Sequence, residues 1–383
     1  MAGAVAMVVF RVLTPQQAIE AVSWDTLLLL LGMMILTSAM TRAGLFKYVS
    51  FLALRRAHGP RAMLAVLVLV AGALSALLVN DTVCLMLTPL VLALVDAAAL
   101  PLLPYLLALA FGSNAGSVAT LTGNPQNMLI GTLSRITFAG FAGALLAPAA
   151  IAVATVLGIL LLVFRAELRR GQAGGAQVAV PPLDRPLALA CAAVLALVLA
   201  GFLLGYSLAW TAMAGAAILI VVSREPSRDL FARVDGTLLL FFAALFIVTH
   251  GVAQAGITER LHAAIAPLLG QTQARQTFVF GAFTVAACQL VSNVPFVLLA
   301  ARWIPKLLDP HLGWLSLALV STLAGNLTPV ASVANLIVLE GAGPRGAIPF
   351  GKFLRIGALC TFLPLLFSLG ALLLERRLGL LGP

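Results

Sequence analysis

The chain has 383 residues, of which 62% are hydrophobic and only 9% are charged. A water-soluble domain with this composition would expose a large apolar surface, so the composition excludes a soluble protein and favours an all-α integral membrane protein. The net charge of +10 does not indicate nucleic-acid binding, because most Arg and Lys residues stand in short segments between apolar runs. The four cysteines show no CxxC or His/Cys spacing, so we expect no disulfide framework, no metal site and no cofactor.

Residues 1–23 form the first segment. Met1 to Leu13 lacks the basic start and the cleavage site of a signal peptide, so we expect the remnant of an N-terminal helix.

Six apolar runs then approach the length of about 20 residues that a helix needs to cross about 30 Å of hydrocarbon. They are Trp24–Thr41, Phe138–Phe164, Leu187–Leu204, Leu208–Val222, Thr237–Ala253 and Phe353–Leu374. We expect each of them to be an ordinary membrane helix.

Four further apolar regions are interrupted by polar residues. Ala62–Val95 is predicted to break at Asn80-Asp81-Thr82, and Leu102–Ile136 from Gly112-Ser113-Asn114 to Asn127. In the second half, Thr277–Ile304 is predicted to break at Ser292-Asn293, and Trp314–Leu339 between Gly325-Asn326 and Asn335.

The order of these breaks indicates an internal repeat. Asn80 pairs with Asn293, Thr120 with Thr328, and Asn127 with Asn335, at a spacing of about 210 residues. If the first and third broken regions are re-entrant hairpins, the chain crosses five times between the copies, and the second copy is inverted. The expected organisation is a first repeat over residues 24–164, a cytoplasmic loop plus a linking helix pair over 165–234, and a second, inverted repeat over 235–383.

Arg and Lys residues set the predicted orientation. They are more numerous on the side that holds Arg55, Arg165 and Arg345 than on the side that holds Arg135 and Arg302. By the positive-inside rule the first side is cytoplasmic, so we expect a multi-pass protein of the cytoplasmic membrane, whose first hairpin enters from the cytoplasm.

Breaks inside hydrocarbon are tolerated only where they line a polar cavity or are buried in protein, so the four breaks together predict a substrate cavity. Asn, Ser and Thr side chains can donate or accept hydrogen bonds there. The predicted substrate-binding residues are Asn80, Thr82, Ser113, Asn114, Thr120, Asn124, Asn127, Ser292, Asn293, Asn326, Thr328, Ser332 and Asn335. The competing interpretation, that such residues only let helices pack closely, applies best to single Ser and Thr residues.

Asp81 is the one carboxylate placed well inside an apolar region. A bare anion is costly there, so the side chain should hold a proton or lie beside a cation. We therefore predict an ion-coupling site for H⁺ or Na⁺ at Asp81, Asn80 and Asn293. The alternative is a structural Asp bound to hairpin amides.

The broken regions also resemble a known family. VNDTVCLMLTPLV (79–91), GSNAGSVATLTGNPQNMLIG (112–131), VSNVPFVLL (291–299) and AGNLTPVASVANLIV (324–338) look like the motifs of the ion transporter superfamily. That superfamily includes arsenite/antimonite permeases, divalent anion:sodium symporters, citrate permeases and one type of sodium/proton antiporter. The resemblance implies two re-entrant hairpins, two broken helices and an elevator-type motion. It also implies a homodimer, as in the dicarboxylate relatives, and a cytoplasmic ATPase subunit as a partner, as in some arsenical permeases.

This chain departs from the dicarboxylate symporters at both hairpin tips. Those relatives carry Ser-Asn-Thr at each tip, whereas this chain has Asn80-Asp81-Thr82 and Ser292-Asn293-Val294. Val294 removes a sodium ligand and Asp81 favours a proton or a cation, so the sequence is closer to the arsenical-permease branch.

We therefore expect a secondary transporter for a small anion or weak acid, arsenite-like or carboxylate, coupled to protons or sodium. The first alternative is a sodium/proton antiporter. An intramembrane enzyme would need a second deep carboxylate, a His pair or a metal cluster, and a passive channel would not explain the matched breaks.

Overall fold

The computed structural model describes residues 1–170, 179–223, 228 and 234–381. Residues 171–178, 224–227 and 229–233 of the predicted loop and linking segment lie outside the described residues. The described part of the chain consists of helices and connecting turns without strands, as expected. Seven of its helices are long and apolar enough to cross a membrane.

The first half begins with two short helices, α1 (Ala2–Val9) and α2 (Pro15–Glu20), before the membrane helix α3 (Trp24–Ala43). The remaining helices are α4 (Leu45–Leu54), α5 (Pro60–Leu77), α6 (Asn80–Ala97), α7 (Leu102–Ser117), α8 (Pro125–Ser134), α9 (Phe138–Val163) and α10 (Glu167–Arg170).

Two linking helices follow, α11 (Arg185–Leu203) and α12 (Leu208–Ser223). The second half contains α14 (Gly236–Gln254), α15 (Ile257–Leu269), α16 (Gln273–Val291), α17 (Asn293–Ala300), α18 (Pro310–Ala324), α19 (Val333–Gly341) and α20 (Phe350–Arg377). Three short 3₁₀ turns join the later helices: η1 (Ile304–Lys306), η2 (Pro329–Ala331) and η3 (Gly343–Gly346).

Matching turns open the two halves. α3 ends at Gly44 with φ 72°, and α14 is followed by Ala255 and then Gly256 with φ 69°. A residue in this left-handed conformation ends a helix at little cost when it is glycine. Each turn leads to a second helix, α4 or α15, so Ala43-Gly44 and Ala255-Gly256 have the same role in the two copies.

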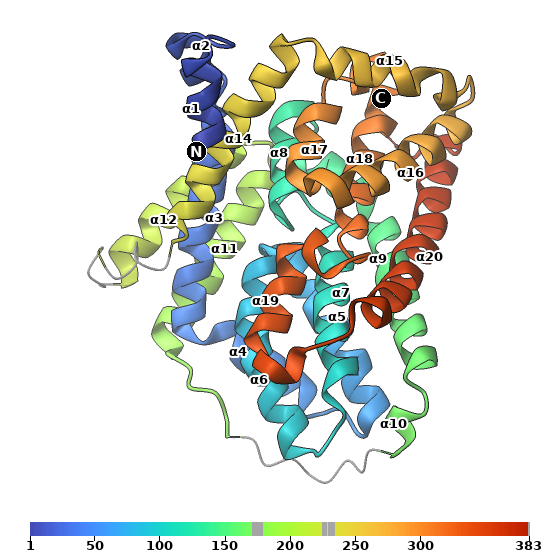
Figure 1. Ribbon diagram of the computed structural model, residues 1–383. Coiled ribbons are helices and arrows are strands. Elements are labelled where there is room, and N and C mark those ends of the chain that lie inside the picture. Colours follow the sequence, from blue (N-terminus) through green and yellow to red (C-terminus); the bar gives the residue numbers. More distant parts are fainter. Residues whose placement is uncertain (171–178, 224–227, 229–233, 382–383) are drawn as a thin grey trace.

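The two halves also point in opposite directions. Figure 1 shows α5 and α6 towards the lower end of the molecule, and α16 and α17 towards the upper end. The broken pair α7–α8 rises from low to high, whereas α18–α19 descends. This arrangement agrees with inverted copies. Because α5 and α6 have 18 residues each and either is long enough to span a membrane, the re-entrant character of the first hairpin stays a prediction.

Helices of the two halves pack into a common core. α5 packs on α7, α9 on α20, and α16 on α18, while α3 packs with α11 and α12. α5 and α7 approach each other closely, because a Cβ on Gly116 would lie 2.2 Å from the Cα of Gly72. Small residues therefore bring these two helices together, which fixes the first break against the hairpin.

Two predicted break positions were wrong in detail. Gly112, Ser113 and Asn114 lie inside α7, and the chain leaves the helix only after Ser117. Gly112 serves helix packing, because its Cβ position is 3.1 Å from the carbonyl oxygen of Val68. In the first hairpin the interruption falls at Leu78 and Val79, so Asn80, Asp81 and Thr82 form the first turn of α6.

Candidate functional site

The two broken helices are joined by a reciprocal pair of hydrogen bonds. Ser332 Oγ donates to Asn114 Oδ1 at 3.1 Å, and Asn124 Nδ2 donates to Thr322 Oγ1 at 3.1 Å. Asn114 and Thr322 are 208 positions apart, as are Asn124 and Ser332. Each bond is therefore the counterpart of the other, which is the pattern of a contact across a two-fold axis. The two breaks meet around such an axis.

Each break is also held by an equivalent asparagine. Asn127 Nδ2 donates to the carbonyl oxygens of Ser117 at 3.1 Å and Thr120 at 3.0 Å. Asn335 Nδ2 donates to those of Gly325 at 2.7 Å and Thr328 at 3.2 Å. In both cases the acceptors lie ten and seven residues earlier. These amides bind carbonyl groups that the interrupted helices leave without intrahelical donors.

Asn114 connects the first hairpin to the second break. Asn80 Nδ2 donates to Asn114 Oδ1 at 2.9 Å, and Asn114 Nδ2 donates to Asn326 Oδ1 at 2.9 Å and Asn335 Oδ1 at 3.3 Å. Asn326 in turn donates to the carbonyl of Cys360 in α20 at 3.2 Å. All four amides are buried, so little of this network is exposed to solvent.

A cavity of about 130 Å³ lies where the two hairpin tips meet the two breaks. Its wall is formed by the following residues: Asn80, Asp81, Pro125, Gln126, Leu238, Phe241, Phe242, Ser292, Asn293, Val294, Ala331, Ser332 and Val333. The lining is itself two-fold related, because Asn80 matches Asn293, and Pro125 matches Val333, at the offsets of the repeat.

Both tips present a helix start to the cavity. Asn80 begins α6 and Asn293 begins α17, so the positive ends of two helix dipoles lie at the cavity. Oδ1 of Asn80 and Oδ1 of Asn293 are buried and have no hydrogen-bond partner within the described residues. Two matched oxygen acceptors are thus unused at the cavity. Ser292, just before α17, has a φ of 70°, a conformation that is strained for a residue other than glycine.

Asp81 is the only charged residue that the described part of the chain contributes to the wall. Its side chain is partly buried, and the described part of the chain supplies neither a hydrogen bond nor an ion pair to its carboxylate. The structural alternative, an Asp held by hairpin amides, therefore finds no contact among the described residues. A carboxylate beside unused amide oxygens has the composition of a site for a proton or a hard cation.

The structure separates the predicted site residues into two groups. Asn80, Asp81, Ser292, Asn293 and Ser332 line the cavity. The remaining ones do not reach its wall: Thr82, Ser113, Asn114, Thr120, Asn124, Asn127, Asn326, Thr328 and Asn335. Most of the second group hold the breaks in shape. Thr120 Oγ1, for example, donates to the Ala76 carbonyl at 2.5 Å, and Thr328 Oγ1 donates to Gln289 Oε1 at 2.8 Å, whereas Ser113 Oγ donates within α7 to the Ala110 carbonyl at 2.8 Å.

Sequence reasoning missed eight residues of the wall: Pro125, Gln126, Leu238, Phe241, Phe242, Val294, Ala331 and Val333. Gln126 follows Pro125 at the start of α8, and Phe241 and Phe242 project from α14. Gln126 offered a signal, because it is a polar residue inside the second broken region. The two phenylalanines offered none, since an aromatic pair in an apolar helix is ordinary composition.

Comparison with known proteins agrees with this architecture. A family model described as CitMHS, citrate transporter, matches residues 1–324. A transporter of Mycobacterium tuberculosis is 31% identical over 366 residues, covering 91% of this chain and 85% of its own length. The rice silicon efflux transporter LSI3 is 30% identical over 407 residues, covering 89% of this chain and 84% of its own length. The crystal structure of the YdaH transporter of Alcanivorax borkumensis superposes with a TM-score of 0.67 at 19% identity, covering 93% of this chain and 86% of that one.

Interrupted helices around a shared cavity, in a chain with seven candidate membrane spans among its described residues, agree with the match to the family model, and together they indicate a membrane transporter. The chain belongs to the citrate transporter family, since the family model matches most of its length. A transporter of this family acts in the lipid bilayer, and its substrate is a small molecule or an ion.

Proposed function

We propose that the protein is a secondary active transporter in which substrate and coupling ion share the cavity between the hairpin tips. The observation that carries this proposal is the position of Asp81, an unpaired carboxylate on the wall of a cavity bounded by both copies of the repeat. A site at the interface of inverted copies can open to either side of the membrane in turn. Alternating access is therefore the mechanism that we propose.

We further propose a small hydroxylated weak acid that is neutral near pH 7, arsenite-like, as the first candidate substrate, and a small carboxylate as the second. No Lys, Arg or His of the residues that the structure describes contributes to the cavity wall. Asn and Ser side chains and helix N-termini bind hydroxyl groups well, but a tricarboxylate such as citrate would meet Asp81 without any cationic side chain to balance it. The name of the rice relative, a silicon efflux transporter, supports a weak acid of this kind.

For coupling we propose a proton carried by Asp81. Inside a membrane, a carboxylate without a hydrogen-bond or ion-pair partner carries a proton at lower cost than a charge. Substrate and proton would then cross together or in exchange, and the direction is set by the gradients.

We also propose the cytoplasmic membrane as the location, with the α5–α6 end of the molecule facing inward, because Arg and Lys are concentrated there in the sequence.

Purified protein in liposomes tests this function. The vesicles are challenged with arsenite, silicic acid, citrate, succinate and sulfate under imposed proton or sodium gradients. We expect saturable arsenite or silicic acid flux driven by a proton gradient, with citrate transported more slowly. Flux of citrate alone would contradict the weak-acid proposal, and an unsaturable current would favour a channel.

A sodium/proton antiporter is the second candidate. The same observation supports it, since Asp81 and the amide oxygens of Asn80 and Asn293 are ligands suited to Na⁺. Addition of sodium alone to vesicles that contain a pH-sensitive dye distinguishes the two. Proton movement without any weak acid present would favour the antiporter.

A further inference from the structure

A second polar feature lies far from the cavity, at the end of α9. A hollow of about 510 Å³ lies between the start of α5, the end of α9 and α10, and its wall is formed by Arg61, Ala62, Leu161, Leu162, Arg165 and Arg169. This end of the molecule is the one that the Arg and Lys distribution predicts to be cytoplasmic.

The hollow concentrates positive charge without a counter-charge. Arg61, Arg165 and Arg169 are exposed, and none of them has an ion-pair partner among the residues that the structure describes. Three guanidinium groups around one space repel each other unless an anion lies between them. Guanidinium groups bind phosphate oxygens in pairs, which makes a phosphate the best-matched anion.

The rest of the wall is apolar. Leu161 and Leu162 belong to the last turn of α9, a helix long and apolar enough to cross the membrane, and Leu162 is 71% exposed. One end of a ligand in this hollow would therefore contact the arginines, and the other end would contact the apolar helix α9. Such a ligand is amphipathic, with an anionic head and an apolar tail.

A neighbouring hollow extends the basic surface around the end of α9. It has a volume of about 570 Å³ and includes Lys352 and Arg355 of α20, together with Glu167. Among the described residues, Glu167 is the only acidic one in either wall. The first hollow, which it does not line, is therefore the better site for an anion.

We propose that the hollow of Arg61, Arg165 and Arg169 binds the phosphodiester headgroup of an anionic phospholipid, whose acyl chains lie along Leu161 and Leu162. Basic pockets between membrane helices on the cytoplasmic side are suited to such headgroups. The site is independent of the transport function proposed above.

Lipid binding to the full-length protein in detergent tests the proposal, with native mass spectrometry as the readout. Phosphatidylglycerol is titrated against phosphatidylcholine, and inorganic phosphate is added in a separate series. We expect phosphatidylglycerol to bind about tenfold more tightly than phosphatidylcholine, and millimolar phosphate to leave this preference intact. Equal binding of the two lipids, or full displacement by phosphate, would overturn the proposal, the latter in favour of a site for free phosphate.

Matched variants locate the site. In the triple variant R61Q/R165Q/R169Q, the preference for phosphatidylglycerol should fall about fivefold or more. The control K47Q/R55Q/R56Q removes the same net charge from the same predicted side but touches neither hollow, and its preference should stay within about twofold. Equal losses in both variants would show a nonspecific surface effect and reject the site. If the triple variant fails to fold, the single variant R165Q should still weaken the preference about twofold, and an unchanged value would reject the site.

Discussion

Ser332 and Asn114 form a hydrogen bond of 3.1 Å that crosses from the second broken helix to the first, and its counterpart joins Asn124 to Thr322 at the same length. These two bonds bring the unwound segments of both copies together. As a result the cavity wall contains Asn80 and Asn293, the first residues of two helices that are 213 positions apart in the chain. The candidate site therefore depends on this symmetric pair of hydrogen bonds and not on any single residue.

Asp81→Asn is the first testable variant. Asparagine keeps the size of the side chain but cannot exchange a proton, so transport should lose its dependence on pH between about pH 5 and pH 8. The measurement is substrate flux into liposomes over that range. Ser292→Ala, at the other tip of the same cavity, is the control and should keep the pH dependence. A pH profile of Asp81→Asn identical to that of the original protein would rule out the coupling role.

Asn335→Asp tests the amide that holds the second break. The carboxylate cannot donate to the carbonyls of Gly325 and Thr328, and it faces them with negative charge. We expect a destabilisation of about 2–4 kcal/mol, and a similar loss for the equivalent Asn127→Asp. Thermal unfolding in detergent measures both.

The control for these two variants is Thr155→Val in α9. The hydroxyl of Thr155 bonds only to the Ile151 carbonyl of its own helix, so its removal should change stability by about 0.5 kcal/mol or less. If only one of the two asparagine variants unfolds early, the equivalence of the two breaks is wrong.

Gly116→Ala tests the contact between α5 and α7. A methyl group there would lie 2.2 Å from backbone atoms of Gly72, so the helices must separate. We expect a loss of about 1–3 kcal/mol and slower transport, because the first break shifts with α7. Gly143→Ala in α9 is the control, since its Cβ would meet no atom within 4 Å and alanine favours a helix. Equal unfolding temperatures for the two variants would contradict the close packing.

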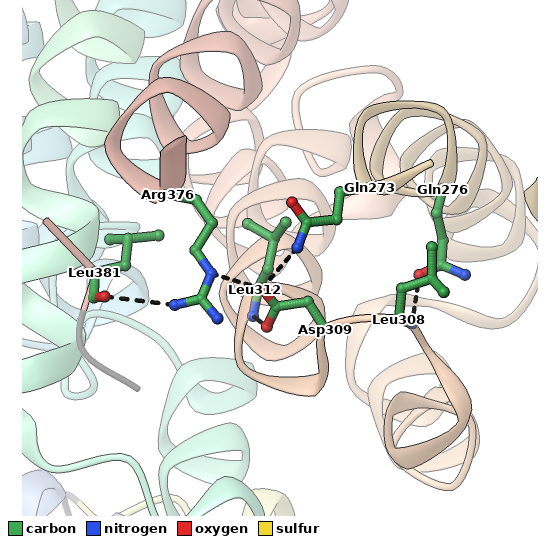
Figure 2. Close-up of polar contacts among 7 residues, drawn as sticks. All are labelled: Gln273, Gln276, Leu308, Asp309, Leu312, Arg376 and Leu381. Atoms are coloured by element: carbon green, nitrogen blue, oxygen red, sulfur yellow. Dashed lines mark hydrogen bonds and ion pairs between the residues drawn. The ribbon is translucent and has the colours of Figure 1, made fainter. Parts of the chain in front are cut away.

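Asp309→Asn tests the polar cluster at the opposite end of the molecule from α10. Asp309 caps α18 through the Leu312 amide at 3.0 Å, pairs with Arg376 Nε at 2.6 Å and accepts from Gln273 at 3.4 Å (Figure 2). These contacts join α16, α18 and α20. Because Asp309 is 6% exposed and Arg376 27%, removing the charge should cost about 1–2 kcal/mol, less than for a fully buried pair.

The comparison variant is Asp96→Asn, which breaks the exposed ion pair with Arg345. Solvent screens that pair, so its unfolding temperature should change little. If the unfolding temperature falls more for Asp96→Asn than for Asp309→Asn, burial does not determine how much these two ion pairs contribute to stability.

Much of the fold follows from the sequence alone. Apolar length predicts the helices that begin at Trp24, Phe138 and Phe350 to within three residues, because hydrocarbon demands continuous apolar helix of a set length. The repeat was also visible, since matched polar residues inside hydrocarbon are costly and are therefore retained only where they have a role. Asp81 was identified on the same ground.

Only the tertiary structure shows which polar residues line the cavity and which bind backbone carbonyls. Asn127 and Asn335 have the same residue type and matched positions as Asn80 and Asn293, yet they bind the carbonyls of their own loops while the latter two reach the cavity. Local sequence cannot separate these roles, because a side-chain amide forms a hydrogen bond with whichever unpaired group the packing brings within about 3 Å. Phe241 and Phe242 close the cavity only because α14 packs beside α17, a contact between distant segments that no local pattern encodes.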